Sequence, residues 1–181
     1  FFLNQRYLSL LLWPPGREIS KRDPIKGIDK LMGDSRHGAL VDEDQVYRRS
    51  GLVDHSRRGH KALAFSMSHG THVMDLACNP PASFSSPAAG SRPIVAVQLP
   101  SATVADTSGA SLGWHVYFAL LYIIVQAEVI ASQGGSGPLP VVVNVSYGRI
   151  AGPHDGSSPF EVALDQLIKI CNTSSAVPFR V

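Results

Sequence analysis

The sequence SHGTHV occupies residues 68–73. Apolar side chains at helical spacing begin with its last residue, Val73, and continue at Leu76 and Ala77. A serine directly before such a pattern is a preferred N-cap, because its hydroxyl accepts a hydrogen bond from the first turn of the helix. The pattern therefore predicts a helix with His69 on its first turn. A histidine held there is rigid, and the helix dipole disfavours its protonated form, so His69 is suited to act as a base.

Downstream of this helix, segments with a strand pattern alternate with segments with a helix pattern. IVAV at residues 94–97 predicts a short buried strand, and the β-branched run VVVNV at residues 141–145 predicts another. Between them, residues 111–132 carry apolar side chains on one broad face, which predicts a long helix that ends at Gly134-Gly135. Strand, helix and strand in this order predict a right-handed crossover in a parallel sheet.

The C-terminal region adds a further helix and strand. Ser158 and Glu161 have the spacing of a capping box and Pro159 stands at the first helical position, so a helix is expected from here to about Cys171. AVPF at residues 176–179 predicts a third strand. The expected fold class is therefore α/β, with a parallel sheet that is flanked by helices and incomplete in its strands.

The N-terminal third of the chain lacks such patterns. Residues 13–61 mix prolines, glycines and charges without a sustained period, which predicts loops and one short helix near residues 42–49. The apolar opening over residues 1–13 is interrupted by polar residues and too short to span a bilayer, so we expect it to be cut from a longer chain. Two regions are expected, a poorly patterned one over residues 1–61 and the α/β region over residues 62–181.

The composition narrows the classes of partner. With 181 residues, 44% of them hydrophobic and 17% charged, the chain can bury a sizeable core. A formal net charge of +2 offers no electrostatic basis for binding nucleic acid. The helix predicted over residues 111–132 is long enough to span a bilayer, but His115, Gln126 and Glu128 within it favour a buried helix, so no membrane partner is expected.

Two segments resemble motifs of the subtilisin-like serine peptidases, or subtilases. HGTHV at residues 69–73 resembles the segment in which that family carries its catalytic histidine, which is the first of the two histidines. NVSYG at residues 144–148 resembles the family's Asn-x-Ser-x-Gly segment, which lines the substrate cleft. The order of strand, Gly/Ser turn, helix and strand between them is also similar to that of the family, so the resemblance covers residues 66–171.

The resemblance implies a subtilisin-like fold, in which three layers are formed by a parallel sheet flanked by helices. It implies a serine-type endopeptidase that hydrolyses peptide bonds through an Asp/His/Ser triad, with His69 as the catalytic histidine that moves the proton. It also implies that Ser146, Tyr147 and Gly148 bind the substrate backbone as an added strand, since glycine allows close approach. The implied partner is a peptide or protein substrate, with no cofactor and no metal.

The sequence departs from the family at the other two members of the triad. No Asp-Thr-Gly or Asp-Ser-Gly segment precedes His69, because DSR at residues 34–36 lacks the glycine and DTS at residues 106–108 follows the histidine. Weak candidates for the acid are Asp34, Asp42, Asp44 and Asp54. The nucleophile motif Gly-Thr-Ser-x-Ala and the oxyanion asparagine segment are absent. We expect the catalytic aspartate and serine to lie outside these residues, and the chain by itself to be inactive.

A second hypothesis is a catalytically inactive descendant of the family that binds peptides. Met74-Asp75 stand where the family usually has Ala-Gly, and these larger side chains would crowd a helix that normally packs closely. Such a descendant would keep residues 146–148 as a peptide-binding edge. The flanking sequence distinguishes the two hypotheses, because only the enzyme needs an aspartate turn upstream and a nucleophile serine downstream.

A third hypothesis is a metal site formed by His69 and His72 with His55 or His60. Histidines one turn apart on a helix can share an ion, but the glutamate of an H-E-x-x-H motif is missing here. The peptidase resemblance accounts for both histidines of HGTHV without a metal.

Localisation stays open, because the family is often secreted and no signal peptide is visible.

Overall fold

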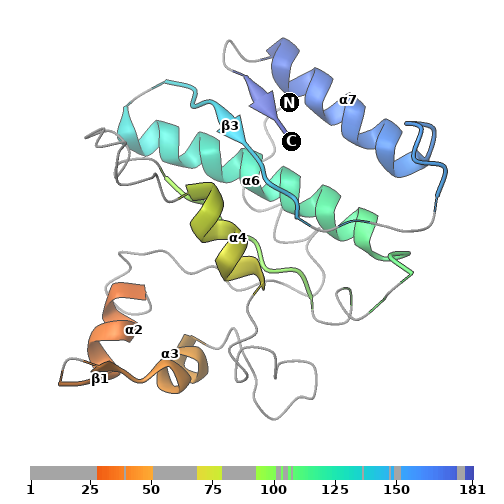
Figure 1. Cartoon of the computed structure of the whole chain (residues 1–181). Coiled ribbons are helices and arrows are strands. Elements are labelled where there is room, and N and C mark those ends of the chain that lie inside the picture. Colours follow the sequence, from red (N-terminus) through yellow and green to blue (C-terminus); the bar gives the residue numbers. More distant parts are fainter. Residues whose placement is uncertain are drawn as a thin grey trace. The chain divides into compact units, whose positions relative to one another are not determined.

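A computed structural model describes residues 28–38, 40–50, 69–78, 93–100, 103, 106, 108–135, 137–146, 148, 152–174 and 178–181 of the chain (Figure 1). These residues fall into two units, with those up to Ser50 in the first unit and those from His69 onward in the second. Helices account for most of the regular structure, and each of the described strands is two residues long.

The first unit is a short hairpin between two helices. Its elements are α2 (Ile28–Asp34), β1 (Arg36–His37), β2 (Leu40–Val41) and α3 (Glu43–Ser50). The two strands pair antiparallel, and Gly38 in the turn has a φ of 65°, a conformation that glycine adopts without strain. Asp42 is the N-cap of α3, because its carboxylate accepts a hydrogen bond from the backbone N–H of Gln45 over 3.1 Å. The helix predicted near residues 42–49 is confirmed, whereas α2 and the hairpin lie where loops were expected.

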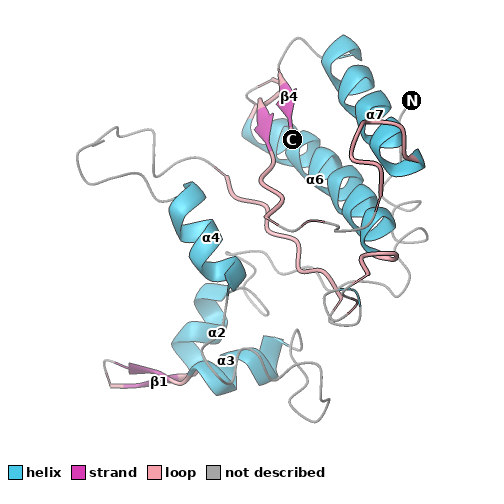
Figure 2. Cartoon of the chain, turned by 45° about the vertical axis from the view of Figure 1, so that its right-hand side comes forward, coloured by secondary structure: helices cyan, strands magenta, loops and turns pink. Residues whose placement is uncertain are grey.

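The second unit combines helices with a parallel pair of strands. Its elements are α4 (His69–Cys78), α6 (Leu112–Gly134), β3 (Val141–Val142), α7 (Pro159–Ser174) and β4 (Phe179–Arg180). Val141 lies opposite Phe179, and the N–H of Val143 donates to the carbonyl of Arg180 over 2.8 Å. Since α7 connects the paired strands, they form a β-α-β unit (Figure 2). The strand predicted over residues 141–145 is confirmed but is shorter than expected. The strand predicted over residues 176–179 begins only at Phe179 and continues to Arg180, and residues 176–177 lie outside the described residues.

The hydrophobic core of this unit lies between two helices and one face of the sheet. Its buried side chains are Leu112, Val116 and Leu120 of α6, Leu167 of α7 and Phe179 of β4. Val141 and Val143 pack against this core, whereas the side chain of Val142 between them is 83% exposed. Alternate residues of a strand point to opposite faces of the sheet, so both helices cover the same face.

The ends of α6 and α7 follow the signals in the sequence. Gly135 ends α6 in the left-handed conformation, with a φ of 62°, and its N–H donates to the carbonyl of Ala131. At the start of α7 the hydroxyl of Ser158 accepts the N–H of Glu161 over 3.3 Å, and a carboxylate oxygen of Glu161 accepts the N–H of Ser158 over 3.1 Å. Both the glycine stop and the capping box are confirmed.

The strand predicted at residues 94–97 is wrong, because residues 93–100 form neither helix nor strand in the structure. Ile94 is 57% exposed, and Leu99 is the residue of this segment that packs against the core. β-branched residues favour a strand only where a neighbouring strand and a buried face are present to pair with them. The predicted crossover through α6 is therefore not formed in the structure, where α7 makes the connection between parallel strands.

Helix α6 is, by length and composition, long and apolar enough to cross a membrane. Helices in the core of soluble proteins also reach this length and apolar composition. Residues on one side of α6 are buried in the core described above, and Phe160 of α7 lies against Gly113. Only 17% of the most apolar 18-residue window of α6 is buried, so the helix is less buried than the sequence predicts for residues 111–132.

Candidate functional site

The candidate catalytic histidine is the first residue of α4, as the sequence pattern predicts. Ser68, the predicted N-cap, lies outside the described residues. The side chains of His69 and His72 are exposed, and Leu76 further along the helix is 71% exposed. Val73 is half-buried, and the other described side chains of α4 are exposed. The helix thus presents His69 to solvent on its first turn.

The predicted substrate-binding segment continues from the end of β3. The hydroxyl of Ser146 donates to Oδ1 of Asn144 over 3.0 Å, and both side chains are exposed. A Cβ atom added at Gly148 would meet no atom within 4 Å, so the backbone there is open to a ligand. Tyr147, the third predicted residue of this segment, lies outside the described residues.

One edge of β3 pairs with β4, and the other edge has no neighbouring strand within the described part of the chain. The N–H groups of Val141 and Val143 donate to the carbonyls of Pro178 and Arg180. Because backbone groups of alternate residues point to opposite edges, those of Val142 and Asn144 point away from β4. Among the described residues β4 is the strand that pairs with β3, so the second edge of β3 has no strand beside it there. An open edge of this kind can pair with an extended peptide.

The structure does not join the two motifs into one site. Among the described residues, no hydrogen bond or ion pair links His69 to Ser146 or Gly148. The same residues contain no group of three or more side chains that could hold a metal ion, and the histidines at 55 and 60 lie outside them. The metal hypothesis therefore gains no support from the geometry.

The candidate carboxylates have structural partners in this chain. Asp34 pairs with Lys30 one turn earlier in α2, and Asp42 caps α3. Asp106 accepts hydrogen bonds from the hydroxyl of Ser108 over 2.6 Å and from the backbone N–H of Ser111 over 3.4 Å. These bonds hold the pKa of Asp106 below its usual value. The side chain of Asp44 and residue 54 lie outside what the structure describes.

His115, which the sequence marks only as a polar residue within the apolar helix, makes defined hydrogen bonds in the structure. Nδ1 of His115 lies 2.8 Å from the carbonyl of Ser111 and 3.2 Å from Oγ1 of Thr103, which is 2% exposed. The carbonyl can only accept, so Nδ1 carries a proton and donates it to the carbonyl of Ser111. His115 thereby ties the segment before α6 to its first turn. No sequence signal identifies Thr103 as its partner.

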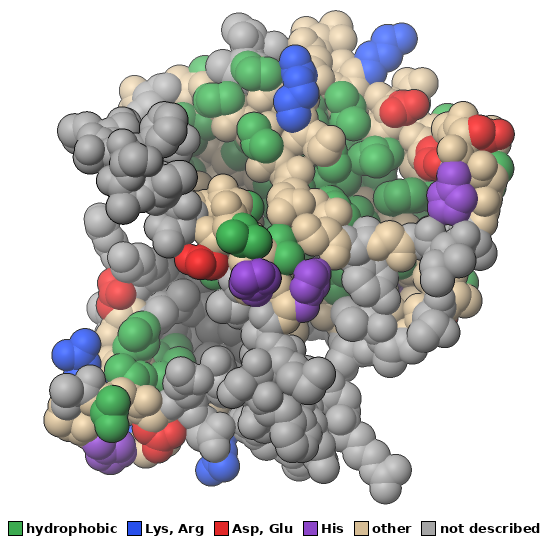
Figure 3. Space-filling view, viewed as in Figure 1, with side chains coloured by type: hydrophobic (Ala, Val, Ile, Leu, Met, Phe, Trp, Pro, Cys, Tyr) green, Lys and Arg blue, Asp and Glu red, His purple; other side chains and the backbone are tan. Residues whose placement is uncertain are grey.

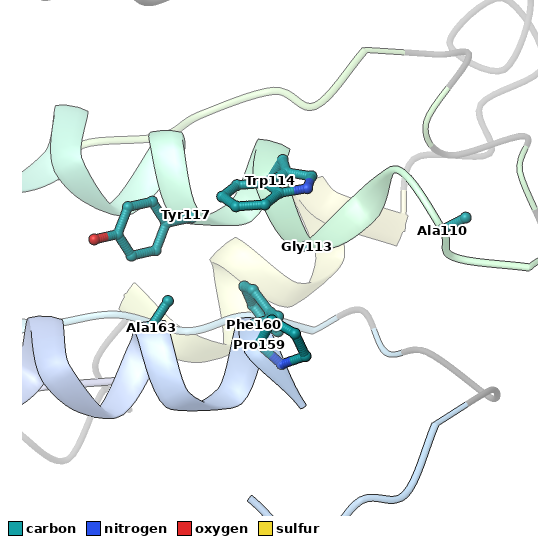
Figure 4. Close-up of a pocket in the computed structure, with 7 residues that line it drawn as sticks. All are labelled: Ala110, Gly113, Trp114, Tyr117, Pro159, Phe160 and Ala163. Atoms are coloured by element: carbon teal, nitrogen blue, oxygen red, sulfur yellow. The ribbon is translucent and has the colours of Figure 1, made fainter. Parts of the chain in front are cut away.

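Sequence patterns also give no sign of a small pocket between the first turns of α6 and α7. It has a volume of about 240 Å³, and its lining is Ala110, Gly113, Trp114, Tyr117, Pro159, Phe160 and Ala163 (Figure 4). The side chain of Trp114 is 64% exposed at its rim. Hydrophobic side chains also remain on other parts of the surface (Figure 3). The lining holds no carboxylate, amine or imidazole, and the polar side-chain groups among its residues are the indole N–H of Trp114 and the hydroxyl of Tyr117.

Comparisons with protein-family models, with curated proteins and with solved structures find no match to this chain. The resemblance to the subtilases therefore rests on the motifs at residues 69–73 and 144–148 and on their order along the chain.

Proposed function

We propose that this chain is part of a subtilisin-like serine endopeptidase in which His69 is the catalytic histidine. The observation that carries the proposal is the sequence HGTHV at residues 69–73, which opens α4 with His69 as its first residue. NVSYG at residues 144–148 adds support, because it follows β3 in a parallel β-α-β unit. For the complete domain we propose the three-layer arrangement of a parallel sheet flanked by helices.

The proposed chemistry gives His69 two proton transfers. It accepts the proton of a serine hydroxyl as the serine oxygen bonds to the scissile carbonyl carbon. It then returns this proton to the leaving amine as the C–N bond breaks, and water completes the hydrolysis by the same route. The imidazolium that forms needs a carboxylate partner on its other nitrogen. The serine and this carboxylate are proposed to lie in further segments of the domain.

The substrate is proposed to be a peptide that pairs with the open edge of β3. The backbone groups of Asn144 and Ser146 would bind the main chain of the peptide, and Gly148 would let it approach closely. Main-chain pairing is independent of side-chain identity, which suits an endopeptidase that accepts many sequences. No cofactor, nucleic acid or membrane is part of the proposal.

The proposal is tested on the intact natural protein with a chromogenic peptide. His69→Ala is expected to lower kcat by about a millionfold, because loss of the base disables the whole triad. His72→Ala is the matched control, since it removes an exposed histidine from the same helix, and it should keep activity within about tenfold. Equal losses in the two variants, or a parent protein without serine-dependent hydrolysis, would reject the proposal.

The same substitution separates the chain from the complete domain. In the 181-residue chain alone, hydrolysis by the parent and by His69→Ala should be indistinguishable, because the nucleophile motif is absent. Turnover that depends on His69 in this chain would contradict the prediction. The measurement is the initial rate of product release at matched protein concentrations.

A second candidate function is peptide binding without catalysis. It is favoured by Met74-Asp75 on α4, which stand where the family usually has Ala-Gly. This function predicts that the intact protein binds peptides without cleaving them, and that Gly148→Val weakens binding by blocking the edge of the strand. Fluorescence anisotropy with a labelled peptide measures the affinity, and cleavage of that peptide would exclude this candidate.

A further inference from the structure

We draw no further inference here: the strongest candidate, the apolar pocket of about 240 Å³ between the first turns of α6 and α7, is a surface for which nothing in the structure shows what covers it.

Discussion

Asp106 shows how one side chain sets the beginning of a helix. Its carboxylate accepts the N–H and hydroxyl of Ser108 and the N–H and hydroxyl of Ser111, the residue before α6. Gly109 follows in the left-handed conformation with a φ of 68°, and its N–H donates to the carbonyl of Asp106. The segment resembles an Asx-turn, in which an aspartate satisfies the amides that a helix start leaves unpaired.

Replacing this carboxylate should loosen the first turn of α6. Asp106→Ala is expected to lower the melting temperature, because the amides of Ser108 and Ser111 lose their acceptor. Asp106→Asn keeps one oxygen acceptor and should lie between Ala and the parent. Thermal unfolding followed by circular dichroism gives the order, and an Ala variant as stable as the parent would show that the turn does not depend on this residue.

Asn172 fixes the other end of the β-α-β unit. Its side-chain amide donates to the carbonyl of Phe179 over 3.1 Å and accepts the N–H of Phe179 over 3.0 Å, so it pairs with β4 as a strand would. Asn172→Ala should cost about 1–3 kcal/mol in the free energy of unfolding, because both groups of a buried residue lose a partner.

Urea denaturation measures this cost. Thr173→Ala is the control, since its hydroxyl bonds to a carbonyl within the same helix on an exposed surface, and the expected change is below about 0.5 kcal/mol. Similar costs for the two variants would mean that the bonds between Asn172 and β4 contribute little.

At the scale of elements, the capping box couples the start of α7 to pH. The hydroxyl and the N–H of Ser158 hold the pKa of Glu161 below its usual value. A carboxylate with a lowered pKa contributes its stability above the pKa of the unfolded chain, near pH 4, and loses it as the pH falls through the folded value. Stability should therefore decline with acid below about pH 4.

Glu161→Gln tests the contribution of this carboxylate, because the amide keeps the shape of the cap but does not titrate. Melting temperatures between about pH 2.5 and 6 should fall less steeply in the variant than in the parent. Asp106 and Asp155 also have lowered pKa values, so some acid sensitivity remains in Glu161→Gln. Identical pH profiles would indicate that the carboxylate of Glu161 is not bonded to Ser158 in solution.

Close packing between elements centres on Gly113. A Cβ atom at this position would lie 3.1 Å from ring atoms of Phe160, so the two helices approach where α6 has no side chain. Gly113→Val should destabilise the fold by about 1–3 kcal/mol through overpacking. The same change in a Phe160→Ala background should cost less, because the ring it meets is gone. An equal cost in both backgrounds would place the strain elsewhere.

The elements that could be predicted from sequence are those with local signals. The capping box of α7, the glycine stop of α6 and the HGTHV start of α4 each lie within a few residues, and all three helices are found. Residues 94–97 carry strand-forming side chains but no strand, because pairing depends on residues that are distant in sequence. The hairpin of the first unit was missed because its strands are two residues long and show no alternation.

For the molecule as a whole, prediction stops at the level where distant segments must meet. The pairing of β3 with β4 follows from the β-α-β order, but the Thr103–His115 contact and the pocket at Gly113 depend on tertiary packing. The candidate site likewise depends on segments that are distant in sequence. Motifs identify His69 and residues 146–148 one by one, whereas a triad is defined by distances between side chains from separate segments.

The edge of β3 that has no neighbouring strand among the described residues carries a risk of aggregation, which proteins that bind extended peptides share. A row of unpaired amides and carbonyls does not distinguish a substrate from another copy of the same strand. The exposed Val142 beside it adds an apolar surface that favours such self-association. A peptide bound at this edge would occupy the unpaired backbone groups, so another copy of the strand could not pair with them. Substrate binding would therefore protect the protein against aggregation.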